Sequence, residues 1–214
     1  MQESILVIII DNKMEEEMDL SSLNSIAQSM VAPKKGILAA DESTPTIGKR
    51  FATIDTESTE SSRQTYRNML FTAPDISDYI SGVILFDETI RQATNDGIPF
   101  AEYLTSVGIV PGIKVDKGAK DLPMHPGENV TEGLDGLRER LEEYYSLGAR
   151  FAKWRAVIGI GDNQPSMTCI DVNAHALARY SALCQEAKMV PIVEPEILMD
   201  GNHSIETCFE VTTK

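Results

Sequence analysis

The chain has 214 residues and a formal net charge of −14 at pH 7, a length that suits one sizeable domain. The negative charge argues against nucleic acid or an anionic membrane surface as a general partner. Three histidines and three cysteines show no paired ligand spacing, which disfavours a histidine-based metal site and indicates reduced cysteines in an intracellular protein. No apolar run approaches the roughly 20 residues of a membrane span.

The first 17 residues are expected to lie outside the fold. Residues 5–10 (ILVIII) are apolar, but no basic region precedes them and an acidic run follows at residues 15–17. This order fits neither a secretory signal nor an Arg-rich transit peptide. We predict that the native start is Met14 or Met18 and that residues 1–13 pack against nothing.

Five short apolar runs, each closed by charged residues, follow one another along the rest of the chain. In order, they are residues 36–42, 81–88, 110–117, 150–157 and 189–197. Continuous apolar strands of this kind are typical of a parallel sheet that is covered on both faces. We therefore predict five parallel strands at these positions.

The segments between these runs predict helices. Apolar residues recur at helical spacing in residues 57–70, 99–107, 132–147 and 167–188, and a further helix is expected to contain the last residues. Strands that alternate with helices indicate an α/β fold. Charged residues at the ends of several strands favour a (β/α)8 barrel. A doubly wound open sheet is the alternative, although no glycine-rich nucleotide fingerprint supports it.

Charged residues of both signs share strand faces near the end of the chain. Glu194 and Glu196 alternate on the fifth run, and Lys153 and Arg155 alternate on the fourth. Buried acids are costly unless a cation meets them, so we expect the two runs to be neighbours and the charges to pair. Taken singly, Glu194, Glu196 and Lys153 would more often be solvated surface charges, and Asp41 would usually be a helix cap.

Six segments in order and spacing carry a family signature. The chain resembles class I fructose-bisphosphate aldolase, a metal-independent glycolytic enzyme, over residues 18–214. The matching segments are residues 38–44 (LAADEST), 82–86 (GVILF), 112–118 (GIKVDKG), 133–137 (GLDGL), 151–155 (FAKWR) and 190–196 (VPIVEPE).

The resemblance implies a (β/α)8 barrel that reversibly cleaves fructose 1,6-bisphosphate into dihydroxyacetone phosphate and glyceraldehyde 3-phosphate through a lysine Schiff base. Asp41 then corresponds to the acid that helps to deprotonate the substrate C4 hydroxyl, and Glu194 to the general acid and base. Glu196 corresponds to a neighbour of the Schiff-base lysine. Lys153 corresponds to the lysine that keeps the acids ionised and contacts the substrate.

The resemblance also assigns supporting residues. Lys114 corresponds to a further cation of the same cluster, and Arg50 and Arg63 to residues on the substrate phosphate side. An exposed arginine is equally ordinary on helix-like segments such as those of Arg50 and Arg63. The family implies no metal and no organic cofactor, a homotetramer and a cytoplasmic location.

The family's Schiff-base lysine lies on the sixth strand, beyond Glu196. Since the chain has five of the eight expected strands, residues 18–214 are expected to form a partial barrel of about five βα units. The Schiff-base lysine is then absent from the chain. We predict that the 214-residue chain alone is inactive. A catalytically incomplete fragment with at most a binding role is the alternative function.

Overall fold

The computed structural model describes residues 20–214. Its strands are β1 (Gly36–Ala39), β2 (Ile80–Leu85), β3 (Val110–Lys114), β4 (Ala119–Asp121), β5 (Asn129–Thr131), β6 (Phe151–Ile158) and β7 (Val190–Ile197). Its helices are α1 (Leu20–Met30), α2 (Thr44–Ala52), α3 (Glu60–Phe71), α4 (Ile76–Tyr79), α5 (Asp87–Ile90), α6 (Phe100–Ser106), α7 (Leu137–Ser146), α8 (Met167–Glu186) and α9 (Ile205–Thr212). The expectations for residues 1–17 concern a segment outside the described residues.

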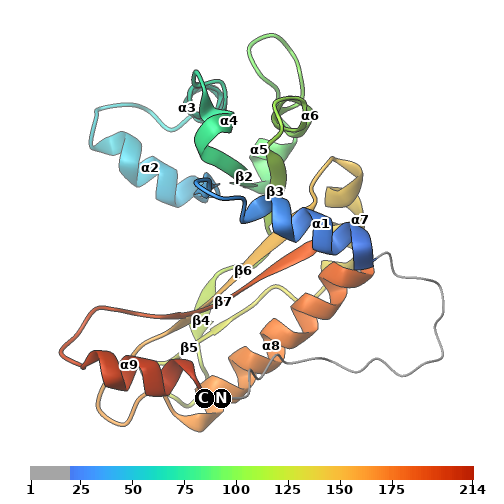
Figure 1. Ribbon diagram of the computed structural model, residues 1–214. Helices are drawn as coiled ribbons and strands as arrows, with labels where there is room; N and C mark the ends of the chain where they lie inside the picture. The colour runs from blue at the N-terminus through green and yellow to red at the C-terminus, as the bar shows by residue number, and fades with distance from the viewer. Residues whose placement is uncertain (1–19) are drawn as a thin grey trace.

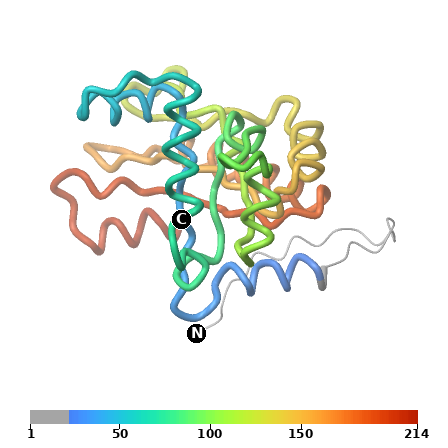
Figure 2. The backbone as a smooth tube through the Cα atoms, turned by 90° about the horizontal axis from the view of Figure 1, so that it is seen from above, coloured from blue at the N-terminus to red at the C-terminus, as the bar shows by residue number. Residues whose placement is uncertain are grey.

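One five-stranded sheet organises the chain. The strand order is β1-β2-β3-β6-β7, and every neighbouring pair is parallel. All five predicted strands are therefore confirmed. The sheet curls, and the helices lie around it (Figure 1; Figure 2 gives the view from above). None of the helices in the described residues is long and apolar enough to cross a membrane.

The helix predictions hold except near residue 132. The segment 129–131 forms β5, which pairs with β4 in an antiparallel hairpin that the sequence did not predict. Helix α7 begins only at Leu137, because Gly136 precedes it in a left-handed conformation with φ 65°. A helix through residues 132–136 is thus wrong, and the reason is the positive φ that glycine permits. Helix α1 and the short helices α4 and α5 also had no predicted counterpart.

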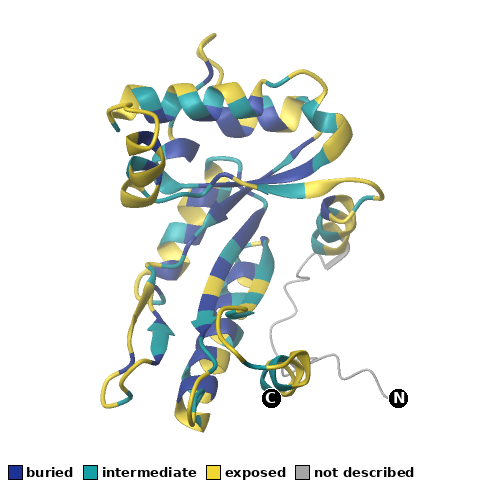
Figure 3. Ribbon diagram, turned by 90° about the vertical axis from the view of Figure 1, so that its left-hand side faces the viewer, coloured by how far each residue is buried: buried dark blue, intermediate teal, exposed yellow. Residues whose placement is uncertain are grey.

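The outer face of the sheet carries the larger core. Side chains alternate along β6, so Ala152, Trp154 and Ala156 all point to the face that α8 covers, and all are fully buried. Tyr180 of α8 packs against Trp154 with ring centroids 5.6 Å apart, and its hydroxyl donates to the Ala152 carbonyl at 2.6 Å. Figure 3 shows the burial concentrated on the strands and on the helix faces toward them. Because α8 covers this face of β6, the alternate side chains of the strand lie on the opposite, inner face of the sheet.

The inner face has a smaller apolar cluster at the amino ends of the strands. Met30 of α1 packs there against Ile84 and Phe151. Phe151 fits because Gly112 lies beside it: a Cβ on Gly112 would lie 2.2 Å from the Phe151 ring. A Cβ on Gly82 would lie 3.2 Å from the same ring. Helix α1 and this cluster close the amino end of the inner face and leave its carboxyl end to polar residues.

Candidate active site

Three charged side chains meet at the carboxyl end of the inner face. The ammonium of Lys153 lies 3.5 Å from Asp41 Oδ2 and 3.4 Å from Glu194 Oε2. The side chains of Lys153 and Asp41 are only 12% and 13% exposed. One ammonium thus lies between two carboxyl groups on a poorly exposed face, so each charge has a partner of opposite sign. The structure thus brings together Asp41, Lys153 and Glu194. The strand pattern predicted that charges on residues 150–157 and 189–197 would pair, whereas Asp41 was placed with them only by the family resemblance. Their catalytic roles stay predictions.

Strand register explains the Lys153–Glu194 pair. Residues Lys153 and Ile192 are Cα partners across β6 and β7, and Arg155 is the partner of Glu194. Cα partners on neighbouring strands lie on the same face of the sheet, and so does every second residue along each strand. Lys153 therefore lies on the same face as Glu194, level with Ile192 and so two residues nearer the amino end of β7. Its long side chain reaches the Glu194 carboxylate diagonally.

Curvature explains the contact with Asp41. Strand β1 is separated from β6 by β2 and β3. Three steps of about 4.8 Å between strands would place the two strands roughly 14 Å apart in a flat sheet. The 3.5 Å contact between Asp41 and Lys153 therefore requires the sheet to curl toward this face. That curvature confirms the barrel prediction against the open, doubly wound alternative.

Lys114 lies one strand away from Lys153. The two lysines are Cα partners across β3 and β6, so both point to the inner face. The Lys114 ammonium is 3.5 Å from Asp116 Oδ1, and the side chain of Asp116 is almost fully buried. Asp116 Oδ1 also accepts from the Gly118 backbone N–H at 3.0 Å. Lys114 thus belongs to the charged face, with its own carboxylate partner.

Glu196 is paired with an arginine that the sequence did not single out as a site residue. The Arg155 guanidinium donates through Nε to Glu196 Oε2. This hydrogen bond, with the charges of Glu196, Glu194 and Asp116, raises the pKa of Arg155 against the effect of burial. The sequence pattern that could have identified Arg155 is its alternation with Lys153, which places both side chains on one face of the strand. The role of Glu196 beside a Schiff-base lysine stays a prediction.

The two arginines assigned to the phosphate side are both engaged with acids. Arg63 is buried and donates to both carboxylate oxygens of Glu88, at 2.8 and 2.6 Å, and to the Ser58 carbonyl. This bidentate bond lowers the pKa of Glu88. Arg50 is largely exposed and lies 2.5 Å from Glu42 Oε1. The structure places neither arginine in contact with Asp41, Lys153 or Glu194, and their substrate roles stay predictions.

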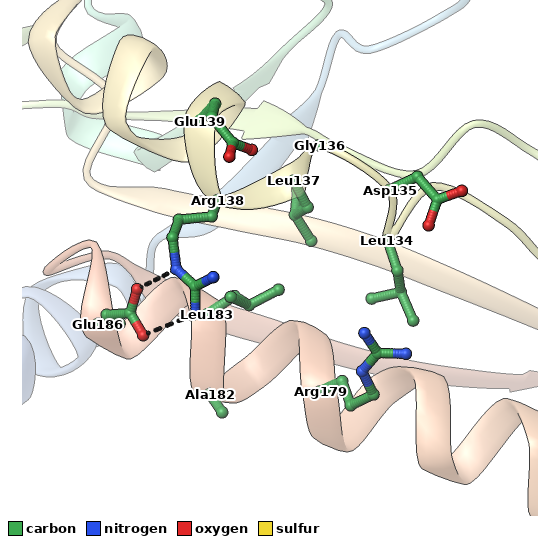
Figure 4. A pocket seen from close by; sticks show the side chains of 10 residues that line it. All are labelled: Leu134, Asp135, Gly136, Leu137, Arg138, Glu139, Arg179, Ala182, Leu183 and Glu186. Carbon is green, nitrogen blue, oxygen red and sulfur yellow. Dashed lines mark hydrogen bonds and ion pairs between the residues drawn. The ribbon is translucent and has the colours of Figure 1, made fainter.

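A hollow on the outer side of the sheet is separate from this charged cluster. A pocket of about 490 Å³ lies between α7 and α8, and Figure 4 shows the Arg138–Glu186 ion pair across one end of it. None of the residues of the charged cluster lines it. Among the described residues, no group of three or more His, Cys, Asp or Glu side chains could hold a metal ion. The charged cluster on the inner face and this pocket are thus two separate places in the fold.

A curled parallel sheet with acids and lysines at its carboxyl ends defines an α/β-barrel protein whose polar site lies at the barrel mouth. Comparison with known proteins agrees. The family model described as "Fructose-bisphosphate aldolase class-I" matches residues 22–214. The chain therefore belongs to the class I fructose-bisphosphate aldolase family.

Individual relatives show how much of the family's length is present. A "Probable fructose-bisphosphate aldolase class 1" of Xanthomonas axonopodis pv. citri is 68% identical over 195 residues, which cover 91% of this chain and 58% of the relative. "Fructose-bisphosphate aldolase 6, cytosolic" of Arabidopsis thaliana is 57% identical over 182 residues, 85% of this chain and 51% of the relative. The chain spans little more than half the length of these relatives.

A solved structure has the same fold. The fructose-bisphosphate aldolase of Plasmodium falciparum, determined in complex with TRAP and a small-molecule inhibitor, superposes with a TM-score of 0.89 at 49% identity. The match covers 94% of this chain and 58% of that chain. The five-stranded curled sheet is thus part of a (β/α)8 barrel.

Proposed function

We propose that the chain carries the acid–base part of an aldol-cleavage site that acts reversibly on fructose 1,6-bisphosphate. The observation that carries the proposal is the position of the Lys153 ammonium between Asp41 and Glu194, 3.5 and 3.4 Å from their oxygens. Relatives that are named fructose-bisphosphate aldolases support the substrate.

The three residues have complementary tasks in this proposal. Asp41 accepts the proton of the substrate C4 hydroxyl as the C3–C4 bond breaks. Glu194 donates and accepts protons during formation and loss of the carbinolamine. Lys153 places a positive charge between the two acids and donates a hydrogen bond to the substrate oxygen. Lys114 adds a second cation on the same face, which suits a substrate with two phosphates.

The electron pair of the broken bond needs an acceptor, which in a class I mechanism is an iminium formed on a lysine. In the described residues, the sheet ends at β7, and the lysines on its inner face are already paired with carboxylates. We propose that the amine comes from a strand next to β7, beyond Glu196. We also propose a cytoplasmic location, since the matched plant relatives are named cytosolic.

The test uses a hybrid protein in which residues 1–214 are followed by the remaining portion of the Xanthomonas relative. We expect the hybrid to cleave fructose 1,6-bisphosphate in excess EDTA. Lys153→Met should lower kcat by at least about 100-fold, the size of a typical acid–base contribution. Lys120→Met on the exposed strand β4 is the matched control and should leave kcat unchanged. Loss of cleavage in EDTA, or full activity of Lys153→Met, would contradict the proposal.

The 214-residue chain itself tests the origin of the amine. Incubation with dihydroxyacetone phosphate and borohydride, followed by intact mass measurement, should show no reduced adduct and no cleavage. An adduct on Lys114 or Lys153 together with measurable cleavage would show that a lysine of the described sheet supplies the amine.

A further inference from the structure

Arg67 is a fully buried arginine behind the charged face. It projects from α3, and its relative exposure is 0%. Burial lowers the pKa of its guanidinium, while the charge of Glu42 acts in the opposite direction. A cation in such a place is costly unless strong hydrogen bonds compensate for the lost water. Its partners therefore indicate what this charge does for the protein.

The partners of Arg67 bracket Asp41. Arg67 Nε donates to the Ala40 carbonyl at 3.2 Å, and Nη2 donates to the Glu42 carbonyl at 2.8 Å. Nη2 also lies 3.7 Å from Glu42 Oε2. One planar guanidinium thus holds the backbone immediately before and immediately after Asp41, just beyond the end of β1. Fixing these two carbonyls restricts the direction in which the Asp41 side chain leaves the backbone.

Helix α3 has contacts with its neighbours α5 and α6 that do not involve this arginine. Phe71 of the same helix is fully buried and packs edge-on against Phe100 at 5.1 Å. Arg63, one turn earlier, binds Glu88 through two hydrogen bonds. Burying an apolar side chain at position 67 would cost less desolvation free energy than burying a charge. The contacts that only Arg67 makes are those to the segment of Asp41.

We propose that Arg67 is a positioning residue that holds Asp41 within reach of Lys153 and of the substrate C4 hydroxyl. The part that concerns the substrate rests on the proposed function. Lysine cannot replace it, because a single ammonium lacks the fixed fork that spans two carbonyls. The same network extends to Arg50 through Glu42, whose Oε1 lies 2.5 Å from Arg50 Nη1. Arg67 acts from the outer layer and touches no substrate.

The first experiment uses the 214-residue chain and needs no activity. The carboxyl carbons of its aspartates are labelled with ¹³C, and the Asp41 resonance is identified by its loss in Asp41→Asn. In Arg67→Lys we expect the Asp41 resonance to move and broaden, while that of the exposed Asp135 before α7 stays in place. An unmoved Asp41 resonance would overturn the inference.

The second experiment uses the hybrid enzyme. We expect Arg67→Lys to lower kcat by roughly 10- to 100-fold, the cost of a misplacement of about 1 Å. KM should change less than about twofold, because Asp41 acts in the transition state and not in ground-state binding. Guanidinium chloride at about 20 mM should restore part of the kcat of Arg67→Ala, whereas sodium chloride should not. A merely structural role would show neither the kcat-only loss nor the rescue.

A further variant guards against a failure to fold. Arg67→Met combined with Glu42→Gln removes both charges of the buried Arg67–Glu42 pair. This variant should fold but have the same lowered kcat as Arg67→Lys. Normal kcat in any folded Arg67 variant would overturn the inference while leaving the proposed function intact. An inactive hybrid with native Arg67 would instead contradict the proposed function, and the resonance experiment would still decide the position of Asp41.

Discussion

Each acid on β7 meets a cation on β6. Glu194 lies beside Lys153, and Glu196 accepts from Arg155. Within each strand, the charged residues of the inner face have the same sign. Opposite charges of these two strands therefore pair only from one strand to the other, and the pairing depends on the register of β6 against β7. Arg63 and Glu88 form a further ion pair, between α3 and α5, in which the two side chains are 10% and 24% exposed. This pair offers a direct measurement of what an internal ion pair contributes.

Glu88→Gln should reduce the free energy of unfolding at pH 7 by about 1.5–3 kcal/mol, the range for hydrogen bonds to charged groups. The hydrogen bond from Arg63 lowers the pKa of Glu88 in the folded state. The pair therefore stabilises the protein above the unfolded-state pKa of about 4.3, and this contribution is lost as the pH falls through the lower folded-state pKa. Urea unfolding of both proteins at pH 7 and pH 3 measures the difference.

The control for this prediction is Glu143→Gln. Glu143 also pairs with an arginine, Arg91, but both side chains are more than 40% exposed. Its substitution should have a smaller effect at pH 7, since solvent screens exposed ion pairs. Equal losses in the two variants would show that burial of the Arg63–Glu88 pair adds nothing.

At the scale of elements, close contact between strands depends on residues without side chains. Gly112 on β3 and Gly82 on β2 leave room for the ring of Phe151 on β6. The ring closes the inner apolar cluster together with Met30 of α1. At the amino end of the sheet, the Phe151 ring therefore packs against the backbone of the two glycines. The charged residues of the inner face lie nearer the carboxyl ends of the strands.

Gly112→Ala should destabilise the protein by about 1–3 kcal/mol, the usual cost of overpacking a core. The added Cβ would lie 2.2 Å from the Phe151 ring, so the ring or a strand must move. Gly36→Ala on β1 is the matched control, because a Cβ there has no atom within 4 Å, and it should change stability by less than about 0.5 kcal/mol. Thermal unfolding of both variants measures the contrast. Equal midpoints would mean that Phe151 moves freely.

At the scale of the molecule, the curled sheet presents an uncovered side next to β7. Strand β7 is the last strand of the sheet in the described residues. Val193 on β7 is 50% exposed, and Phe209 and Ile205 on α9 are 67% and 75% exposed. An open strand edge beside exposed apolar side chains favours pairing with another chain.

We expect the 214-residue chain to associate as its concentration rises, and we expect Phe209→Asp to weaken this association by at least about tenfold. The reason is that a charge at the uncovered side opposes burial of apolar surface. Sedimentation velocity over a range of concentrations measures it. Met69→Asp replaces an apolar residue of α3 that is 60% exposed, close to the 67% of Phe209, and it should have little effect. A monomer at all concentrations would show that the side next to β7 does not drive association.

The sequence by itself determined the strands and the faces on which their charges lie. Alternation placed Glu194 with Glu196, and Lys153 with Arg155, because successive side chains of a strand point to opposite faces. Charged residues after apolar runs also indicated which ends of the strands carry the polar site. These are local properties of a strand, so they can be predicted without knowledge of its neighbours.

Tertiary structure alone decided which charges meet. The contact of Asp41 with Lys153 depends on curvature across four strands, and the pairing of Glu196 with Arg155 depends on the register of β6 against β7. Arg67 reads as an ordinary helix arginine in the sequence, yet the packing of α3 places it behind the backbone of Asp41. Such contacts join residues that are far apart in the chain, and their distances follow from how the layers pack.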